Sequence, residues 1–346
     1  MSELVSLQQS IQKNCDLIDA RFAQKFILCT YLLKMREYYR WAKKIPFSTS
    51  LPKDKLMEWV LKQELYWEDI ESHEQERVAI GSQEFDPLQT DIINRHLKDK
   101  NLVYGGGYGY ANVPVYFLGR LKKREEREGY TLTITSQEFA RGMIALPGAL
   151  QGNHIIIRRE ALRSLLWSRV EEWQFQKRDN PMGQAISFYD FQNNPDRAIE
   201  AMTDQEMESV IQHEIGEGRA GERLGDVWNE MLFNHPHTKL AVFARAVRDC
   251  FADCMTTLPY LLGEKKESSI HFFIANLSGM RQEISPALKR AYKEWEKDKD
   301  YSRLRDITEQ GKTHWQETAG KIIDLYQNNG ESSVSVIESM IETTRL

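Results

Sequence analysis

The pattern of hydrophobic positions predicts long helices in the N-terminal part of the chain. Over residues 4–43, hydrophobic side chains recur at three- and four-residue steps, as they do on one face of a helix. A helix of that length would reach about 60 Å at roughly 1.5 Å per residue, so we expect a bend or break near Cys15–Asp19. A second helix is predicted over Lys53–Glu71. A third is predicted to begin at Asp86–Pro87, a pair suited to the cap and first position of a helix, and to run to about Lys98.

Between residues 102 and 157 the pattern changes to one that is typical of strands. β-branched and aromatic residues dominate Val113–Leu118 and Tyr130–Ser136, and the charged segment between them predicts the turn of a β-hairpin. His154–Ile157 predicts a further short strand. The segment Tyr104–Tyr110, with the sequence YGGGYGY, is interpreted as a packed turn, with a lid over a ligand as the alternative.

The helical pattern returns at Arg159 and continues to the end of the chain. Asn194–Pro195 is another cap and first-position pair, and Thr203–Glu206 fits a capping box, which predicts the start of a central helix. A further helix is predicted over Thr238–Leu258, and three or four more helices are expected within Ser268–Leu346.

These elements predict an α+β protein that is predominantly α-helical, with a small antiparallel β-hairpin or sheet around residues 102–157. A chain of 346 residues can form two domains or one large one. We divide it into an N-terminal helical part (1–100), a small antiparallel β element (101–158) and a C-terminal helical part (159–346), which together could form one compact domain.

Titratable chemistry is concentrated in Thr203–Gly225. His213 and Glu217 are four residues apart, so a helix places them on one face. Glu214 follows His213, where the H-E-x-x-H zinc motif carries its general base, although position 217 is Glu where the motif has a second His. We therefore expect His213 and Glu217 to bind a divalent metal (zinc, iron or manganese) and Glu214 to act as a general base.

A catalytic metal needs at least one more protein ligand. The next predicted helix offers Asp249 and Asp253, again four residues apart, as the further ligands. The leading functional hypothesis is thus a metal-dependent enzyme, hydrolase-like in its chemistry. The alternative for this segment is an ordinary hydrogen bond or weak ion pair between His213 and Glu217 on the surface of a helix.

The same segment is rich in glycine. Gly216, Gly218 and Gly221 match the dinucleotide-binding pattern G-x-G-x-x-G by letter, but a helix precedes them where that fingerprint requires a strand. Each glycine inside a helix costs about 1 kcal/mol relative to alanine. We therefore expect close approach of another element to Gly218, Gly221 and Gly225, or a local break in the helix.

Two other hypotheses do not involve a metal. A non-enzymatic helical scaffold or regulatory protein would use the glycines for tight helix packing and bind a protein partner. A small-molecule binder would use Arg36 and Arg40, which share a helix face, together with the YGGGYGY segment to hold an anionic group. For the two arginines themselves, pairing with Glu37 or with acids of the next helix is the expected outcome.

Composition narrows the cellular context. A net charge of −5 and a pI near 6.0 argue against nucleic acid as the main partner. No apolar run approaches the roughly 18 residues that cross a bilayer, and the N-terminus lacks the pattern of a secretory signal, so no membrane partner is expected. Four scattered cysteines fit a reducing compartment, and we expect a cytoplasmic protein whose partner is a small molecule or another protein.

Two stretches, Cys15–Trp41 and His213–Gly225, resemble an uncharacterised bacterial protein family, a domain of unknown function. The resemblance implies a bacterial, cytosolic origin. It brings no established activity and assigns no catalytic residue.

Overall fold

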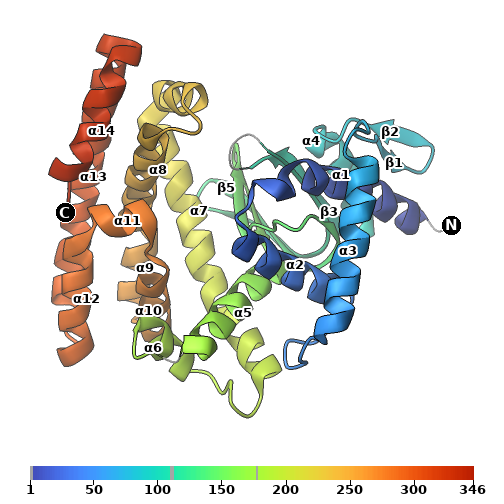
Figure 1. Ribbon diagram of the computed structural model, residues 1–346. Helices are drawn as coiled ribbons and strands as arrows, with labels where there is room; N and C mark the ends of the chain where they lie inside the picture. The colour runs from blue at the N-terminus through green and yellow to red at the C-terminus, as the bar shows by residue number, and fades with distance from the viewer. Residues whose placement is uncertain (1–2, 110–112, 177) are drawn as a thin grey trace.

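The computed structural model describes residues 3–109, 113–176 and 178–346, and most of these residues are helical. A curled sheet and the N-terminal helices form one side of the molecule, and a group of C-terminal helices forms the other (Figure 1). The long helix α7 (Pro195–Asn234) runs between them. The predicted class, α+β with mainly helical content, is confirmed.

Three helices make up most of the N-terminal part: α1 (Glu3–Phe22), α2 (Leu28–Ala42) and α3 (Lys53–Ile70). The break predicted near Cys15–Asp19 is wrong, because α1 continues through it and the chain turns at Ala23–Lys25 instead. Both ends of the predicted break are buried against the sheet region, where Cys15 Sγ donates to the carbonyl of Tyr116 and Asp19 accepts from the backbone N–H of Met143. These contacts hold the middle of α1 in place.

The main sheet has five strands in the order β3-β4-β5-β7-β6. Their bounds are β3 (Leu102–Tyr108), β4 (Pro114–Arg127), β5 (Tyr130–Arg141), β6 (Gly148–Gln151) and β7 (His154–Arg158). The sheet is mixed and not purely antiparallel as predicted, since β5 and β7 pair in parallel. The segment Tyr104–Tyr108 belongs to β3 and Tyr104 is fully buried, so these residues are not a turn or a lid; Tyr110 lies outside the described residues.

The hairpin turn between β4 and β5 is shorter than the sequence indicated. Arg127 pairs with Tyr130, so the turn consists of Glu128 and Gly129 alone, both with positive φ (55° and 90°). Two such residues form the turn type whose twist matches that of the flanking strands. The charged residues that were predicted to form the turn therefore extend the strand.

A two-stranded hairpin, β1 (Val78–Ile80) and β2 (Gln83–Phe85), and the short helix α4 (Thr90–Leu97) precede the main sheet. Helix α4 begins later than predicted. Asp86 does not cap it, because its Oδ1 accepts from the N–H of Leu88 within a turn that ends at Gln89.

The remaining helices are α5 (Arg159–Gln176), α6 (Pro181–Ser187), α8 (Lys239–Ala252), the π-helix η4 (Asp253–Thr257), α9 (Leu258–Gly263), α10 (Glu267–Asn276), α11 (Gly279–Ile284), α12 (Pro286–Asp298), α13 (Ser302–Asn329) and α14 (Val334–Thr343). Their core includes the fully buried Trp228, Trp295 and Trp315.

Helix α7 begins at Asn194, whose side chain accepts from the N–H of Arg197. The start predicted at Thr203–Glu206 is wrong. Thr203 lies inside the helix and donates its hydroxyl to the carbonyl of Ile199, and Glu206 accepts from Ser269. Because Asn194 already caps the helix upstream, Thr203 is an interior residue and not a cap.

The glycines of α7 divide into two groups. A Cβ on Gly216 would lie 2.6 Å from the carbonyl oxygen of Ala252, and a Cβ on Gly218 would lie 2.7 Å from the ring of Tyr130. The close approach predicted for Gly221 and Gly225 is wrong, since a Cβ there would meet nothing within 4 Å. At Gly225 the alternative, a local break in the helix, is confirmed, with φ at 72°, a conformation that favours glycine.

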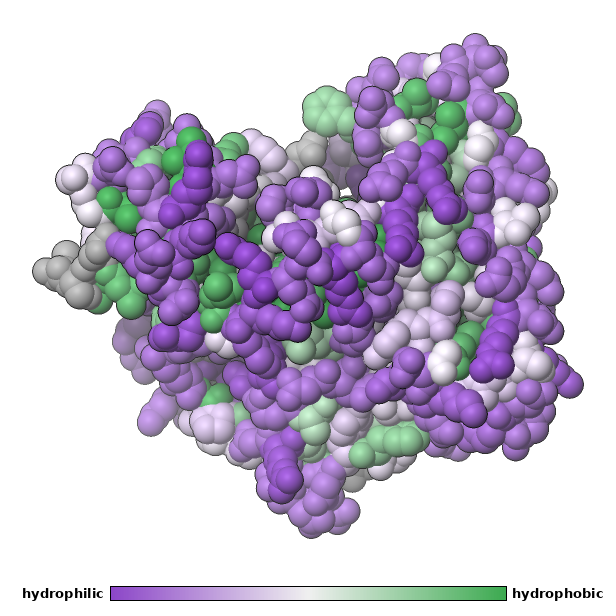
Figure 2. All heavy atoms as spheres, turned by 180° about the vertical axis from the view of Figure 1, so that it is seen from behind, coloured by the Kyte–Doolittle hydropathy of each residue, from purple (hydrophilic) through white to green (hydrophobic). Residues whose placement is uncertain are grey.

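None of the described helices is long and apolar enough to span a membrane. The face of the molecule in Figure 2 is mainly hydrophilic, with hydrophobic side chains in small, separate groups.

Candidate functional site

The residues predicted to bind a metal gather in part around His213. Its Nδ1 lies 2.9 Å from Oδ1 of Asp253 at the start of η4, and its Nε2 lies 3.5 Å from Oε1 of Glu217 one turn along α7. Arg248 donates to Glu217 (2.8 Å) and to Asp249 (3.2 Å). The sequence thus correctly indicated that the helix after α7 brings acids to this place.

Charge compensation dominates this cluster. Burial favours the neutral imidazole of His213, but the Asp253 and Glu217 carboxylates outweigh it and raise its pKa well above the usual value. Burial also opposes ionisation of Asp253, yet Arg281, which forms an ion pair with it, and His213 lower its pKa. Each carboxylate beside His213 therefore has a cationic partner.

This arrangement does not fit a metal as it stands. Within residues 3–109, 113–176 and 178–346, no three His, Cys, Asp or Glu side chains are placed to hold one ion. Arg248 and Arg281 occupy the carboxylates that would be ligands. Glu214, the predicted general base, points elsewhere and packs against Gly148 of β6. Metal binding stays a prediction, and the cluster is here an ion-pair network between α7, α8 and α11.

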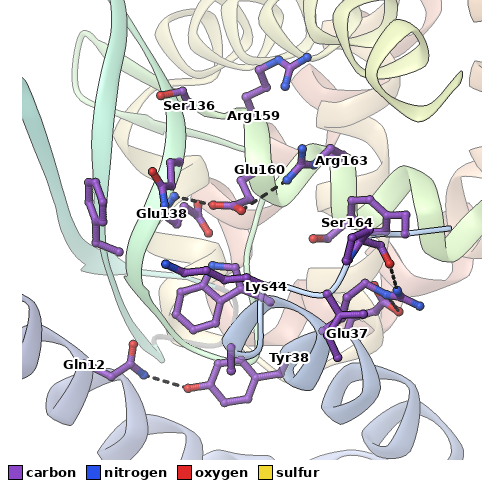
Figure 3. A pocket seen from close by; sticks show the side chains of 18 of the residues that line it. Gln12, Glu37, Tyr38, Lys44, Ser136, Glu138, Arg159, Glu160, Arg163 and Ser164 are labelled. Carbon is purple, nitrogen blue, oxygen red and sulfur yellow. Dashed lines mark hydrogen bonds and ion pairs between the residues drawn. The ribbon is translucent and has the colours of Figure 1, made fainter. Parts of the chain in front are cut away.

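A second and larger site was not predicted. A cavity of about 880 Å³ lies between α1, α2 and α3 on one side and β5, α5 and the start of α7 on the other. Figure 3 shows its polar walls, with Tyr38 and Gln12 on one side, Glu138, Glu160 and Arg163 on the other, and Lys44 between them. Cavities of this size can bury most of the surface of a bound small molecule.

Asp16 lines the cavity from α1. Its Oδ1 accepts hydrogen bonds from the Tyr38 hydroxyl (3.1 Å) and from the amides of Gln12 (3.2 Å) and Gln63 (3.4 Å). All three donors are neutral. Burial raises the pKa of Asp16 to about 6, and these hydrogen bonds offset only part of that effect. A carboxyl group that is buried without a cation favours the protonated form.

Glu37 lines the same cavity from α2. Neither of its carboxylate oxygens accepts a hydrogen bond from any residue that the structure describes, and its closest cation, Nε of Arg40, is 3.8 Å away. Burial raises its pKa to about 7, against the opposing effect of Arg40. Its side chain is only 12% exposed. The cavity thus has a second carboxyl group that titrates near neutrality.

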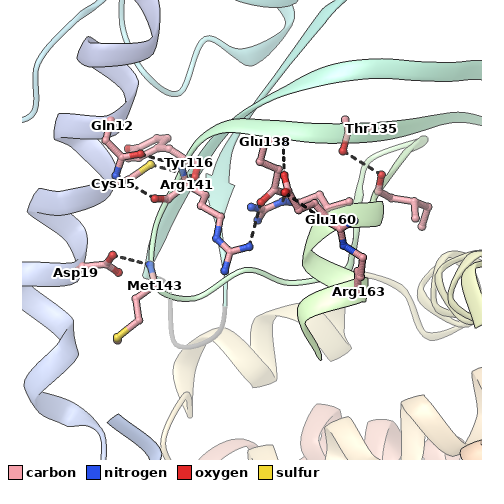
Figure 4. A network of polar contacts seen from close by, with 12 residues as sticks. Gln12, Cys15, Asp19, Tyr116, Thr135, Glu138, Arg141, Met143, Glu160 and Arg163 are labelled. Carbon is pink, nitrogen blue, oxygen red and sulfur yellow. Dashed lines mark hydrogen bonds and ion pairs between the residues drawn. The ribbon is translucent and has the colours of Figure 1, made fainter. Parts of the chain in front are cut away.

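The opposite wall is a fully buried ion-pair network (Figure 4). Glu138 of β5 accepts from Arg158 at 2.6 Å and from Arg141 at 3.4 Å, and these two arginines lower its pKa despite its burial. Glu160, at the start of α5, accepts from the backbone N–H of Glu138, and burial raises its pKa. Gln12 connects this wall to Asp16, since its side chain bonds both the N–H and the carbonyl of Arg141.

The chain between α2 and α3 borders the cavity and is fixed at two points. Arg40 donates to the carbonyls of Pro46 (2.6 Å) and Thr49 (3.1 Å). Ser48 donates its N–H (3.1 Å) and its hydroxyl to Asp196 at the start of α7. Both α2 arginines form ion pairs, as predicted. The predicted partner is confirmed for Arg40, which pairs with Glu37, whereas Arg36 pairs with Glu171 of α5 and not with an acid of the next helix.

The chemical capacity of the cavity follows from its carboxyl groups. Groups with a pKa near the working pH are suited to act as general acids and bases. Buried titratable groups that line a cleft mark a candidate site. Asp16 and Glu37 meet both criteria.

Only part of this site could be recognised from the sequence. Its residues come from six elements, and no short motif joins them. An available sign was Asp16, an acid that lies among the hydrophobic positions of an amphipathic helix. The stretch Cys15–Trp41, on which the family resemblance rests, contains both Asp16 and Glu37.

The fold and the cavity together define a mainly helical α+β protein with a polar cavity between its N-terminal helices and β5, α5 and the start of α7. The chain belongs to DUF6866, a family of unknown function: the model of its N-terminal domain matches residues 6–158 and the model of its C-terminal domain matches residues 163–344. No curated protein and no solved structure matches the chain. The resemblance to a family of unknown function is therefore confirmed, and the division of the chain into three parts stays a prediction.

Proposed function

We propose that this protein binds a small polar molecule in this cavity, which the N-terminal family domain lines for the most part and the C-terminal one on one side, and that Asp16 and Glu37 exchange protons with it. One observation carries the proposal: two buried carboxyl groups line a single large cavity, Asp16 with no cationic partner and Glu37 with no hydrogen bond. A buried carboxylate is costly unless it has both hydrogen bonds and an opposite charge. Asp16 has hydrogen bonds but no cation, and Glu37 has Arg40 at 3.8 Å but no hydrogen bond.

The position of the cavity supports the proposal. Asp16, Glu37 and Glu138 belong to the segment matched by the N-terminal family model, whereas Arg163 and Ser164 belong to the C-terminal one. Small-molecule sites occur preferentially at such domain interfaces, where residues from both sides converge on one ligand.

A cavity-filling substitution tests the proposal. Ser164 faces the open space from α5 (Figure 3), and Ser164→Phe would occupy part of it without altering any carboxyl group. In a thermal-shift screen of small polar molecules, we expect compounds that raise the melting temperature of the wild-type protein and leave that of Ser164→Phe unchanged. Ser339→Phe, at an exposed position of α14, is the control and should respond like the wild type. Equal responses of all three proteins would overturn the proposal.

A metal-dependent enzyme centred on His213 is a second proposal. The observation that favours it is the convergence of Glu217 and Asp253 on the two nitrogens of one imidazole. The arginine pairs oppose it. Metal analysis of protein purified without chelator tests it: a stoichiometric metal that is lost in His213→Ala supports it, and the absence of metal from both proteins rejects it.

A cytoplasmic, bacterial protein without nucleic acid as its main partner remains part of our proposal. The net charge of −5 supports the absence of nucleic acid as the main partner, the small number of cysteines supports the cytoplasm, and the bacterial origin rests on the family resemblance alone.

A further inference from the structure

We infer that the ligand of this cavity carries a positively charged amine, which Asp16 binds directly. The inference rests on the proposed function and adds the chemical class of the ligand. The charged groups that line each wall of the cavity support it.

The arginines of the α5 wall are already neutralised. Arg159 pairs with Glu200 (2.7 Å) and Asp204 (2.8 Å), and Arg163 pairs with Glu160 (3.5 Å) and also with Glu200. A guanidinium with such partners has little remaining attraction for an anion, because the ligand would have to displace a carboxylate held by charge-assisted hydrogen bonds.

The arginines of the sheet and of α2 are also engaged. Arg141 and Arg158 share the carboxylate of Glu138, and Arg40 holds two backbone carbonyls of the chain between α2 and α3. Lys44, on that connecting chain, is exposed to solvent. The arginines of these walls therefore serve the protein's own structure. Lys44 also lines the cavity, but it is not among the groups that affect the pKa of Asp16.

Asp16 differs from every one of these acids. Its hydrogen-bond donors are a hydroxyl and two amides, so they orient the carboxyl group without neutralising its charge. A carboxylate that faces a cavity and lacks a cation is complementary to a cationic ligand, since the ligand supplies the missing partner.

The surrounding side chains suit an alkylammonium group. Trp59, Gln63 and Tyr66 of α3 line the cavity on the side where Gln63 reaches Asp16. Aromatic rings and amide oxygens attract a cation and also cover the carbon chain that carries it. An amine is thus favoured over a bare metal ion at this place.

Three four-carbon probes with end groups of different charge test the inference: putrescine (cationic), 1,4-butanediol (neutral) and succinate (anionic). We expect calorimetric titration at pH 8 to show binding of putrescine to the wild-type protein, with butanediol and succinate at least about tenfold weaker, as loss of a charge-assisted hydrogen bond implies. Asp16→Asn should lose this preference, while Asp69→Asn, at an exposed position of α3, should keep it.

The outcomes distinguish a failure of the amine inference from a failure of the proposal that the cavity is the ligand site. If butanediol or succinate binds as tightly as putrescine and Ser164→Phe abolishes that binding, the cavity is the site but its ligand is not an amine. If putrescine binds equally to the wild type, Asp16→Asn and Ser164→Phe, the site itself is elsewhere. Glu37→Gln serves as the second variant if Asp16→Asn does not fold, and it should weaken putrescine binding without removing the preference for charge.

Discussion

The hydroxyl of Tyr38 lies 3.1 Å from Oδ1 of Asp16 and joins α2 to α1 at the wall of the cavity. Tyr38 is buried, and its ring stacks on Trp41 with the centroids 5.6 Å apart. The ring is thereby held in the position from which its hydroxyl can support a buried carboxylate.

Replacement of Tyr38 by phenylalanine should remove that support. Because a buried acceptor would lose a donor, we expect Tyr38→Phe to lower the free energy of unfolding by about 1–3 kcal/mol at pH 8. The effect should be smaller in an Asp16→Asn background, since an amide needs less stabilisation than a carboxylate. Urea unfolding of the four proteins of this double-mutant cycle measures the coupling, and additive effects would show that the two residues act independently.

The glycines of α7 predict opposite effects of one substitution. Gly216→Ala places a methyl group against the backbone of Ala252 and should destabilise the protein by about 1–3 kcal/mol. Gly221→Ala meets open space and should stabilise it by roughly 0.5–1 kcal/mol through helix propensity. The two melting temperatures, measured side by side, check this. A lower melting temperature for Gly221→Ala would contradict the observed packing.

Glu206 predicts a pH dependence of stability. Its carboxyl group is 1% exposed and accepts from Ser269 and Ser209, and burial raises its pKa from 4.5 to about 7. Between these two values the folded state holds a proton that the unfolded state has released, so the stability contributed by this group is lost as pH rises.

Glu206→Gln should therefore gain stability over the wild type as the pH is raised from 4.5 to 7. The gain amounts to as much as roughly 3 kcal/mol at 1.36 kcal/mol per pKa unit. Unfolding free energies of both proteins across this range test the point. A difference that does not change with pH would mean that Glu206 is ionised throughout.

The ion pair between Arg281 and Asp253 predicts a large cost for a single substitution. The Asp253 side chain is 3% exposed, and Arg281→Met leaves it with His213 as its remaining charged partner. We expect a loss of about 3 kcal/mol in unfolding free energy. Arg345→Met breaks an exposed pair with Glu283 and should cost less than about 1 kcal/mol. Similar losses for the two variants would show that the buried Asp253 pair contributes no more to stability than an exposed pair.

Much of the fold could be predicted from the sequence, because hydrophobic periodicity depends on local burial. The helices over Lys53–Ile70 and Arg159–Gln176 and the strands on either side of Gly129 follow from it. The parallel pairing of β5 with β7 could not be predicted, since it depends on which strand the chain returns to after β6. Local signals also misplaced the start of α7, where Asn194 and Thr203 both look like caps.

The candidate sites show the same limit. The spacing of His213, Glu217, Asp249 and Asp253 indicated that charged groups would gather, but Arg281 comes from a distant helix and changes what the group can do. The cavity depends mainly on long-range packing, since two of the three donors to Asp16 lie 22 and 47 residues away from it.

The central claim is that Asp16 is kept as a carboxyl group for a ligand and at a cost to stability. Its pKa rises from 3.8 to about 6 on folding, so the wild type loses stability as the pH rises through this interval. The most direct measurement is the unfolding free energy of the wild type and of Asp16→Asn at pH 5 and pH 8. We predict that Asp16→Asn is the more stable protein at pH 8, by roughly 3 kcal/mol at 1.36 kcal/mol per pKa unit, and that its advantage shrinks at pH 5. A less stable Asp16→Asn at pH 8 would contradict the account, because Asp16 would then be a structural residue.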